Sequence, residues 1–298
     1  MAYHVPALLE ESIEGLNIMP SGIYVDVTFG GGGHSKEILK HLTTGRLIAF
    51  DQDEDAERNV FTDTKFLFLN QNFRFLKNNL KFNGISTVDG ILADLGVSFH
   101  QFDEPARGFT FRQDAPLDMR MNKNGNQKAS DLLSSISEVE LADLFYEYGE
   151  LTNSRKIAKS IVIARKEKPL KSVSDIEKAI GSLAPFRQEH KFYAKVFQAL
   201  RIAVNREIEF LKEMLLQALD VLNPGGRLVV ITYHSLEDRV IKNFMKTGNF
   251  TGEEVKDFYG NPVTPFKLIT KKGIVPNENE IMENNRSRSA RLRIAEKI

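Results

Sequence analysis

The sequence predicts an α/β protein whose mostly parallel sheet carries helices on both faces and is interrupted by an inserted all-helical domain. Three observations support this prediction. Short β-branched and aromatic runs alternate with helical stretches through the first third of the 298 residues. The block that follows has helical periodicity alone. Strand-like runs return only after that block.

Each expected strand is short, rich in β-branched or aromatic residues and followed by a polar turn. Such runs occupy residues 23–29, 46–51, 65–70, 88–95 and 227–233, and a helix is expected at 35–42. A turn at 223–226 precedes the last run and a helix follows it at 236–246. Residues 266–270 and 290–295 predict a closing antiparallel pair.

The inserted block has apolar residues at helical spacing. Helices are expected at 137–148, 153–166 and 188–222, the last one bent near Asn205. Ser174 with Glu177 predicts a capping box that opens one more helix. We therefore expect a Rossmann-like core formed by residues 1–110 and 216–298, and an inserted helical substrate-recognition domain at 111–215.

The composition is that of a folded globular protein, with 42% hydrophobic and 27% charged residues. No apolar run reaches the roughly 18 residues that a membrane span needs, and the first residues lack the pattern of a signal peptide. We therefore expect a cytoplasmic protein without a membrane partner. The chain has no cysteine, which excludes disulfides, thiolate zinc sites, iron–sulfur clusters and a cysteine nucleophile.

Basic residues are concentrated in two segments, although the formal net charge is zero. Residues 151–213 hold twice as many Lys and Arg as Asp and Glu. The C-terminal segment carries Arg286, Arg288, Arg291, Arg293 and Lys297. Both segments suit a polyanion such as RNA, but a solvated helix face and a frayed tail would give the same pattern.

Four glycines at 30–33 stand between the first expected strand and the following helix. Such a loop lets the backbone pass close to a nucleotide cofactor, while the N-terminus of the helix points at it. Asp51, at the end of the second strand, can accept hydrogen bonds from both ribose hydroxyls. The glycines and the aspartate together predict a nucleotide-type cofactor.

Asp26 decides between two cofactors. Gly30, Gly32 and Ser35 also match the nicotinamide dinucleotide pattern loosely. A carboxylate just before the glycines can pair with the methionine ammonium of S-adenosylmethionine, whereas a dinucleotide would bring its pyrophosphate close to that negative charge. Asp26 therefore favours S-adenosylmethionine, unless its role is only to cap the turn.

Two further strand ends carry candidate residues. Asp94 ends the fourth strand and Gln101 follows within one loop, where ligands bind in open α/β sheets. His234 follows the fifth strand. We expect no metal there, because the spacing is not the i, i+4 pair of a helical zinc site and because Ser235 with Asp238 fits a helix cap.

Eight sequence stretches stand in order along the chain. They begin at His4, Asp26, Asp94, Arg107, Pro116, Gln198, Tyr233 and Arg286, and they are HVPALL, DVTFGGGGHS, DLGVS, RGFTF, PLDMRM, QALRIAVN, YHSLEDR and RSRSARLR. Together they closely resemble the MraW family of methyltransferases. The resemblance implies a Rossmann-like methyltransferase sheet with a helical insert, and methylation of the exocyclic N4 of a decoding-region cytidine in 16S rRNA of the small ribosomal subunit.

The resemblance also implies a set of cofactor contacts, carried over position by position. These are Gly32, Gly33, His34, Asp51, Phe73, Asp94 and Gln101. Without the resemblance, Phe73 would be expected in the core. With it, Phe73 is expected beside the adenine. Family members usually have a serine after Ser98, where this chain has Phe99 and then His100, so the family's local substrate contacts are not carried over to this loop.

The residues also bear on mechanism. Methylation of cytosine at carbon 5 normally needs a cysteine, so a nitrogen or oxygen acceptor is expected. Asp94, or a backbone carbonyl in 95–98, is the candidate catalytic group that accepts an N4 proton. The basic insert and the tail at 286–293 are expected to hold RNA phosphates.

Two alternatives stay open. The same core could methylate a small molecule or a protein, in which case activity would not depend on RNA. A cofactor-binding RNA chaperone without catalysis is the other alternative, although Asp94 and the complete glycine loop speak against it. The sequence does not decide between a monomer and a homodimer.

Overall fold

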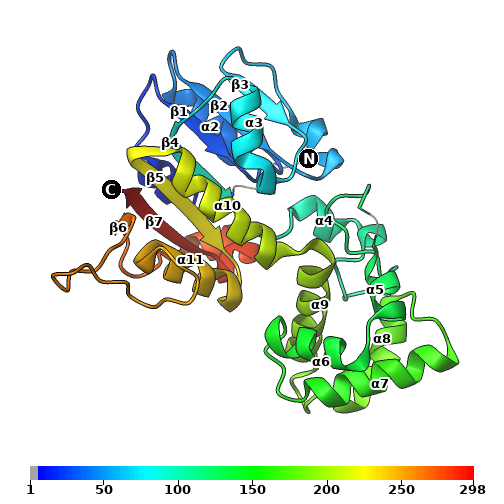
Figure 1. Cartoon of the computed structure of the whole chain (residues 1–298). Coiled ribbons are helices and arrows are strands. Elements are labelled where there is room, and N and C mark those ends of the chain that lie inside the picture. Colours follow the sequence, from blue (N-terminus) through cyan, green and yellow to red (C-terminus); the bar gives the residue numbers. More distant parts are fainter. Residues whose placement is uncertain (1–5, 126) are drawn as a thin grey trace. The chain divides into compact units, whose positions relative to one another are not determined.

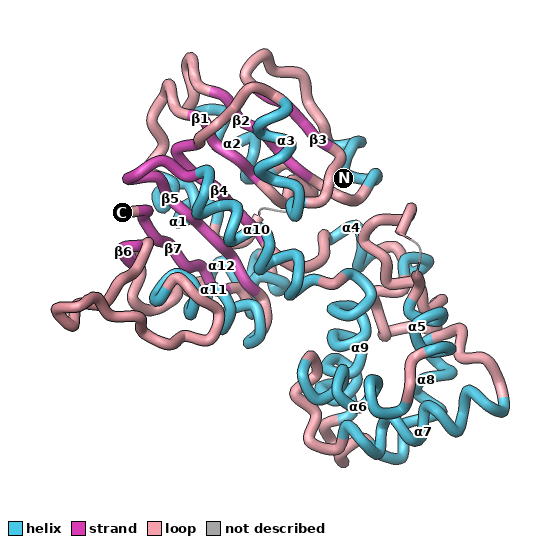
Figure 2. Tube along the Cα trace, in the orientation of Figure 1, coloured by secondary structure: helices cyan, strands magenta, loops and turns pink. Residues whose placement is uncertain are grey.

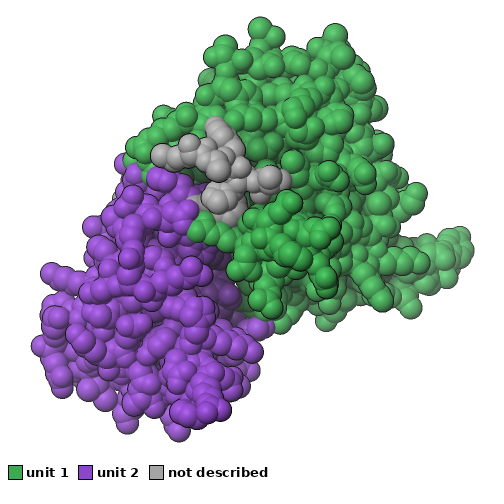
Figure 3. All heavy atoms as spheres, turned by 180° about the vertical axis from the view of Figure 1, so that it is seen from behind, with its two compact units in different colours: residues 1–96, 208–298 green, residues 97–207 purple. Residues whose placement is uncertain are grey.

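The computed structural model of the protein describes residues 6–125 and 127–298. His4 and Val5, which open the first of the shared stretches, lie outside the described residues. The chain forms two compact units, one made of Met1–Gly96 with Ile208–Ile298 and the other of Val97–Glu207 (Figure 3). No helix in the described ranges is both long enough and apolar enough to cross a bilayer.

A seven-stranded sheet forms the centre of the first unit, in the order β3-β2-β1-β4-β5-β7-β6 (Figure 1). The five strands β3, β2, β1, β4 and β5 are parallel to one another. Strand β7 runs antiparallel to both of its neighbours, β5 and β6. The strands are β1 (Ile23–Asp26), β2 (Arg46–Phe50), β3 (Phe66–Leu69), β4 (Val88–Asp94), β5 (Leu222–Thr232), β6 (Phe266–Leu268) and β7 (Arg291–Lys297). The predicted parallel strands and the closing antiparallel pair are confirmed.

Helices cover both faces of the sheet because the buried residues of each central strand alternate between two cores. Leu228 and Val230 of β5 face the core that α3 (Leu76–Phe82), α10 (Glu207–Val221) and α11 (Ser235–Thr247) complete. Val229 and Ile231 face the core of α1 (Leu9–Leu16) and α2 (Gly33–His41). The last helix, α12 (Glu278–Glu283), precedes β7.

The second unit consists of helices joined by loops (Figure 2). Its helices are α4 (Phe99–Asp103), α5 (Ala129–Ser135), α6 (Glu138–Glu147), α7 (Ser154–Glu167), α8 (Val173–Ile180) and α9 (Glu189–Asn205). They surround a core of their own that includes Phe145, Ile161 and Leu200. The predicted bend near Asn205 is confirmed, because Arg206 has a φ of 51° and separates α9 from α10.

The second unit begins and ends earlier than the predicted insert at 111–215. Phe109 already belongs to the helical core, and Val97 packs against it. Leu211 and Met214, in contrast, pack on the sheet. The sequence pattern could not place these ends, because apolar helical spacing does not tell which of two cores a helix covers.

Two local predictions were wrong. The cap of α8 is formed by Ser172 with Asp175, not by Ser174 with Glu177, because the helix begins at Val173. The predicted turn at 223–226 lies inside β5, where the pairing with β4 shifts from Val88 opposite Leu222 to Gly90 opposite Arg227. The extra residues form an irregularity in the strand rather than a separate turn.

Candidate active site

Three aspartates stand at the ends of adjacent parallel strands. Asp26 ends β1, Asp94 ends β4 and Asp51 directly follows β2. Strand β1 lies between the other two, and Asp26 pairs with Ala49 of β2 and with Leu92 of β4. Because the carboxyl ends of parallel strands meet at one edge of a sheet, the structure brings these three carboxylates to the edge where ligands bind in open α/β sheets.

Asp26 holds the glycine loop in shape. Its Oδ2 accepts a hydrogen bond from Ser35 Oγ at 2.7 Å, and its Oδ1 accepts one from Thr28 N at 3.1 Å. Only 1% of the residue is exposed. The geometry therefore corresponds to the capping role that the sequence left open. Both carboxylate oxygens already accept hydrogen bonds within the loop, so a direct contact of Asp26 with a ligand ammonium stays a prediction.

The glycine loop between β1 and α2 has a shape that other residues could not adopt at Gly32 and Gly33. Gly32 has a φ of 74°, and a Cβ there would lie 2.8 Å from the ring of Phe29. A Cβ on Gly33 would collide with Pro6. Asp51 fixes the loop to the end of β2, because its Oδ2 accepts a hydrogen bond from Gly30 N at 2.8 Å. This role adds to the predicted contact with ribose.

Asp94 is connected to both neighbouring strands. Its backbone N–H donates to Thr28 Oγ1 at 2.6 Å. Its Oδ1 accepts a hydrogen bond from the Tyr233 hydroxyl at 2.8 Å, and its Oδ2 lies 3.8 Å from His34 Nδ1. Sequence reasoning did not select Tyr233. The signal available was its place directly after β5, the strand beside β4.

The three carboxylates are poorly hydrated and close together. Burial raises the pKa of Asp26 and Asp51 to about 6 and that of Asp94 to about 7, and the charge of Asp26 contributes to the last two shifts. A cationic ligand would reverse this effect by favouring the ionised carboxylates. The sulfonium and ammonium groups of S-adenosylmethionine fit this requirement, whereas a dinucleotide would add negative charge.

His34 lies in the first turn of α2 and is neutral at pH 7, because burial lowers the pKa of its imidazole to about 4. Its 3.8 Å distance to Asp94 is therefore not an ion pair. Its Nε2 is buried, and no hydrogen-bond partner for it exists among the described residues. A buried polar atom without a partner at a ligand-binding edge suits a cofactor contact, so the residues present fit the predicted cofactor.

The remaining two predicted cofactor contacts have different positions. Phe73 opens a short 3-10 helix after β3, is partly buried and packs against the core of the first unit. This placement agrees with both roles considered for it. Gln101 belongs to α4 in the second unit, where its Oε1 accepts a hydrogen bond from Ser98 N in a capping box. Its contact with the cofactor stays a prediction.

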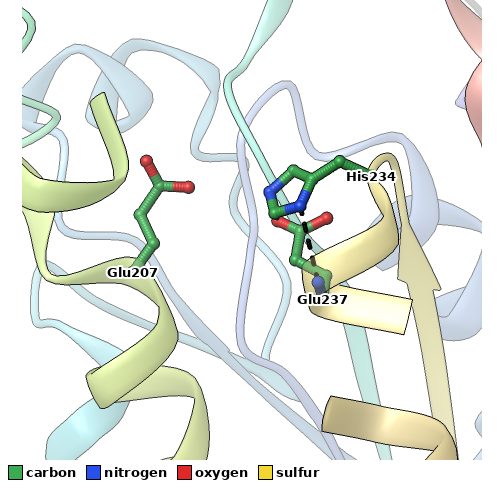
Figure 4. A group of neighbouring side chains, drawn as sticks. All are labelled: Glu207, His234 and Glu237. Atoms are coloured by element: carbon green, nitrogen blue, oxygen red, sulfur yellow. Dashed lines mark hydrogen bonds and ion pairs between the residues drawn. The ribbon is translucent and has the colours of Figure 1, made fainter. Parts of the chain in front are cut away.

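His234 is the N-cap of α11, which corrects the predicted cap of Ser235 with Asp238. Its Nδ1 accepts a hydrogen bond from Glu237 N at 3.4 Å, and its Nε2 lies 3.1 Å from Glu237 Oε1 (Figure 4). Glu207, also labelled in Figure 4, belongs to the second unit. Asp238 instead accepts two hydrogen bonds from Arg293, at 2.6 and 2.9 Å.

That pair also corrects the expectation that the whole basic tail holds phosphates. Arg293 lies in β7 and is buried against Asp238. Lys297 donates to the carbonyl oxygens of Leu219 and Leu222. Both side chains are thus committed to the fold of the first unit. In the tail at 286–293, the exposed arginines are Arg286 and Arg288.

A model of the MraW methylase family matches residues 1–298. The chain belongs to this family. Ribosomal RNA small subunit methyltransferase H of Bacteroides fragilis strain YCH46 is 58% identical over 296 residues, which cover 99% of this chain and 97% of the relative. The protein of the same name from Flavobacterium johnsoniae is 53% identical over 299 residues, with 100% and 99% covered.

The MraW chain is thus a methyltransferase, and its cofactor is S-adenosylmethionine. Among solved structures, a Streptococcus mutans protein described as a methyltransferase, in complex with SAH, has a TM-score of 0.46 at 12% identity, with 99% of both chains covered. The predicted α/β fold and the predicted family are confirmed.

Proposed function

We propose that this MraW protein transfers a methyl group from S-adenosylmethionine to the exocyclic N4 of a cytidine in 16S rRNA of the small ribosomal subunit, in the cytoplasm. The observation that carries the proposal is the cluster of Asp26, Asp51 and Asp94 at the carboxyl ends of β1, β2 and β4, beside the glycine loop, in a chain of this family. The relatives described above are named ribosomal RNA small subunit methyltransferase H, which supports the choice of substrate.

The cofactor would be held by the edge of the sheet. Gly32, Gly33 and His34 would lie against it, and Asp51 would accept hydrogen bonds from the ribose hydroxyls. Phe73, which follows β3, would lie beside the adenine. Gln101 stays in the proposed set on the resemblance to the family alone. When bound, the cofactor supplies the methyl group on a sulfonium, and the protein aligns the acceptor with it and excludes water.

Asp94 is the proposed catalytic residue. The N4 lone pair of cytosine is delocalised into the ring, so a base that accepts an N4 proton localises the lone pair as the new N–C bond forms. Asp94 Oδ2 has no hydrogen-bond partner among the described residues, and 23% of the side chain is exposed. The carboxylate is therefore able to take that proton.

The function is tested by incubating the purified protein with labelled S-adenosylmethionine and small ribosomal subunits from cells that lack the enzyme. We expect label on the N4 of one cytidine of 16S rRNA. Label in ribosomal protein or in an added small molecule, with none in RNA, would favour the alternative substrate classes. RNA binding without any label would favour a chaperone.

A basic stripe on α7 suits the RNA backbone, and we propose that it recognises substrate. The stripe consists of Arg155, Lys156, Lys159 and Lys166, all exposed. Positions 155, 159 and 166 fall on one side of a helix, because they are four and seven residues apart. Glu167 is the one acidic residue of α7.

Replacing Arg155 and Lys159 together with glutamine is expected to weaken RNA binding and to lower the slope of log affinity against log salt concentration by about 1 to 1.5, because fewer counterions are released when two phosphate contacts are missing. The measurement is filter binding of a 16S rRNA fragment at several KCl concentrations. Lys178→Gln on α8, an exposed lysine beside Glu177, is the control. An unchanged slope in the double variant would remove α7 from the RNA interface.

A further inference from the structure

We infer that Tyr233 is a positioning residue for methyl transfer: its hydroxyl fixes the Asp94 carboxylate so that Oδ2 stays available to the acceptor amino group. The inference rests on the function proposed above. Tyr233 directly follows β5, and Ile231 of β5 pairs with Asp94 of β4. This register brings the Tyr233 hydroxyl to 2.8 Å from Asp94 Oδ1.

Tyr233 is itself held in place. Its backbone N–H donates to Glu237 Oε2 at 2.9 Å, and its side chain packs against the core formed with α1 and α2. Burial, followed by the nearby charge of Asp94, raises the pKa of the Tyr233 phenol well above its usual value. The phenol therefore keeps its proton at any working pH. The direction of the hydrogen bond follows, with Tyr233 as donor and Asp94 as acceptor.

The remaining contacts of Asp94 leave one oxygen for chemistry. Its backbone N–H is used by Thr28 and its Oδ1 by Tyr233. Its Oδ2 is 3.8 Å from the neutral imidazole of His34, which is beyond hydrogen-bond distance. Without the Tyr233 hydroxyl, the carboxylate could rotate about its Cβ–Cγ bond, and no oxygen would then be held at the position that Oδ2 occupies.

The same hydrogen bond affects ionisation. Burial and the charges of Asp26 and Glu237 raise the pKa of Asp94, whereas the Tyr233 hydroxyl lowers it by stabilising the carboxylate. His34, the other titratable group facing Asp94, is uncharged near neutral pH. Tyr233 thus orients Asp94 and also keeps a larger fraction of it in the form that accepts a proton.

A role in stability alone is the competing explanation, and a second tyrosine provides the control. Tyr24 lies in β1 of the same sheet and is buried. Its hydroxyl accepts a hydrogen bond from Met19 N at 2.7 Å, and the carboxylate that acts on it is that of Asp89, not one of the three aspartates. Tyr24→Phe therefore removes a buried hydroxyl from the same unit without touching the proposed site.

The experiment compares Tyr233→Phe and Tyr24→Phe with the unmodified full-length protein, using labelled S-adenosylmethionine and small ribosomal subunits between pH 5.5 and 9. For Tyr233→Phe we expect kcat to fall about 10- to 100-fold and the acid limb of the pH profile to move up by about one pH unit, because a hydrogen bond to a charged group is lost. KM for both substrates should stay within about twofold, because no substrate contact is removed. Tyr24→Phe should change neither kcat nor the position of the acid limb of the pH profile.

A second measurement does not depend on turnover. The pKa of Asp94, followed by carbon-13 NMR of its labelled carboxyl group, should rise in Tyr233→Phe and stay unchanged in Tyr24→Phe. Suppose that Tyr233→Phe has the same kcat, the same acid limb of the pH profile and the same Asp94 pKa as the unmodified protein. The positioning role of Tyr233 is then wrong, while the proposed function stands. If the unmodified protein leaves subunit RNA unlabelled, the proposed function is wrong, whatever the variant does.

Discussion

Asp94→Asn is expected to lower kcat by about 10²- to 10⁴-fold, because the amide cannot accept the N4 proton that the proposed mechanism assigns to the carboxylate. Asparagine keeps the size of the side chain and an oxygen for the Tyr233 hydroxyl. The measurement is single-turnover methylation of small subunits with saturating labelled S-adenosylmethionine. Full turnover with a weaker cofactor affinity would leave Asp94 a binding role and remove the catalytic one.

The same substitution should increase stability in the absence of cofactor. The folded-state pKa of Asp94 is raised to about 7 from an ordinary value near 4. The stability associated with this group is therefore fully present below pH 4 and is lost as the pH rises through 7. Asp94→Asn removes that loss, so we expect its free energy of unfolding at pH 8 to exceed that of the unmodified protein by about 1 to 3 kcal/mol.

Urea unfolding at pH 5.5 and pH 8, without cofactor, measures this difference. The gap between variant and unmodified protein should be smaller at pH 5.5, where most of the folded protein has Asp94 protonated. Asp89→Asn is the matched control, because Asp89 lies in the same strand but caps its other end, accepting hydrogen bonds from Ile23 N and Asn223 Nδ2. Asp89→Asn should not gain stability at pH 8. An equal gain in both variants would contradict the account of Asp94.

The sequence predicted most of the first unit because its signals are local. Apolar residues that alternate along a strand, as in Leu228 to Ile231, fix which side chains face each helical layer. The closing antiparallel pair was recognisable for the same reason. The end of the insert was not, because the helical pattern runs on from α9 into α10 while the packing changes from one core to the other.

The candidate site was predictable where it depends on strand ends. Three parallel strands that each end at an aspartate must bring those residues to one edge, so Asp26, Asp51 and Asp94 could be grouped without coordinates. Tyr233 was not selected, although it directly follows β5, because a tyrosine after a strand is usual in a core. Arg293 was assigned to RNA because charge alone does not show that an arginine in a strand is buried against a carboxylate such as that of Asp238.

Asp51→Ala is expected to weaken S-adenosylmethionine binding by about 10²- to 10³-fold, since two contributions are lost together. One is the pair of hydrogen bonds proposed from the carboxylate to the ribose hydroxyls, and hydrogen bonds to a charged group contribute about 1.5 to 3 kcal/mol each. The other is the anchor of the glycine loop, because Asp51 Oδ2 accepts from Gly30 N and Oδ1 from Asp53 N. Isothermal titration calorimetry with the cofactor measures the affinity.

A second variant separates these two contributions. Asp51→Asn has one acceptor oxygen, so it can keep the hydrogen bond from Gly30 N or a ribose contact, but it lacks the charge. If the anchor dominates, Asp51→Asn should bind the cofactor much more tightly than Asp51→Ala; if the ribose contacts dominate, both should be similarly weak. Asp63→Ala, which removes the acceptor for Lys65 N before β3, is the control and should bind normally. Tight binding by Asp51→Ala would contradict both proposed contributions of this carboxylate, the ribose contacts and the anchor of the glycine loop.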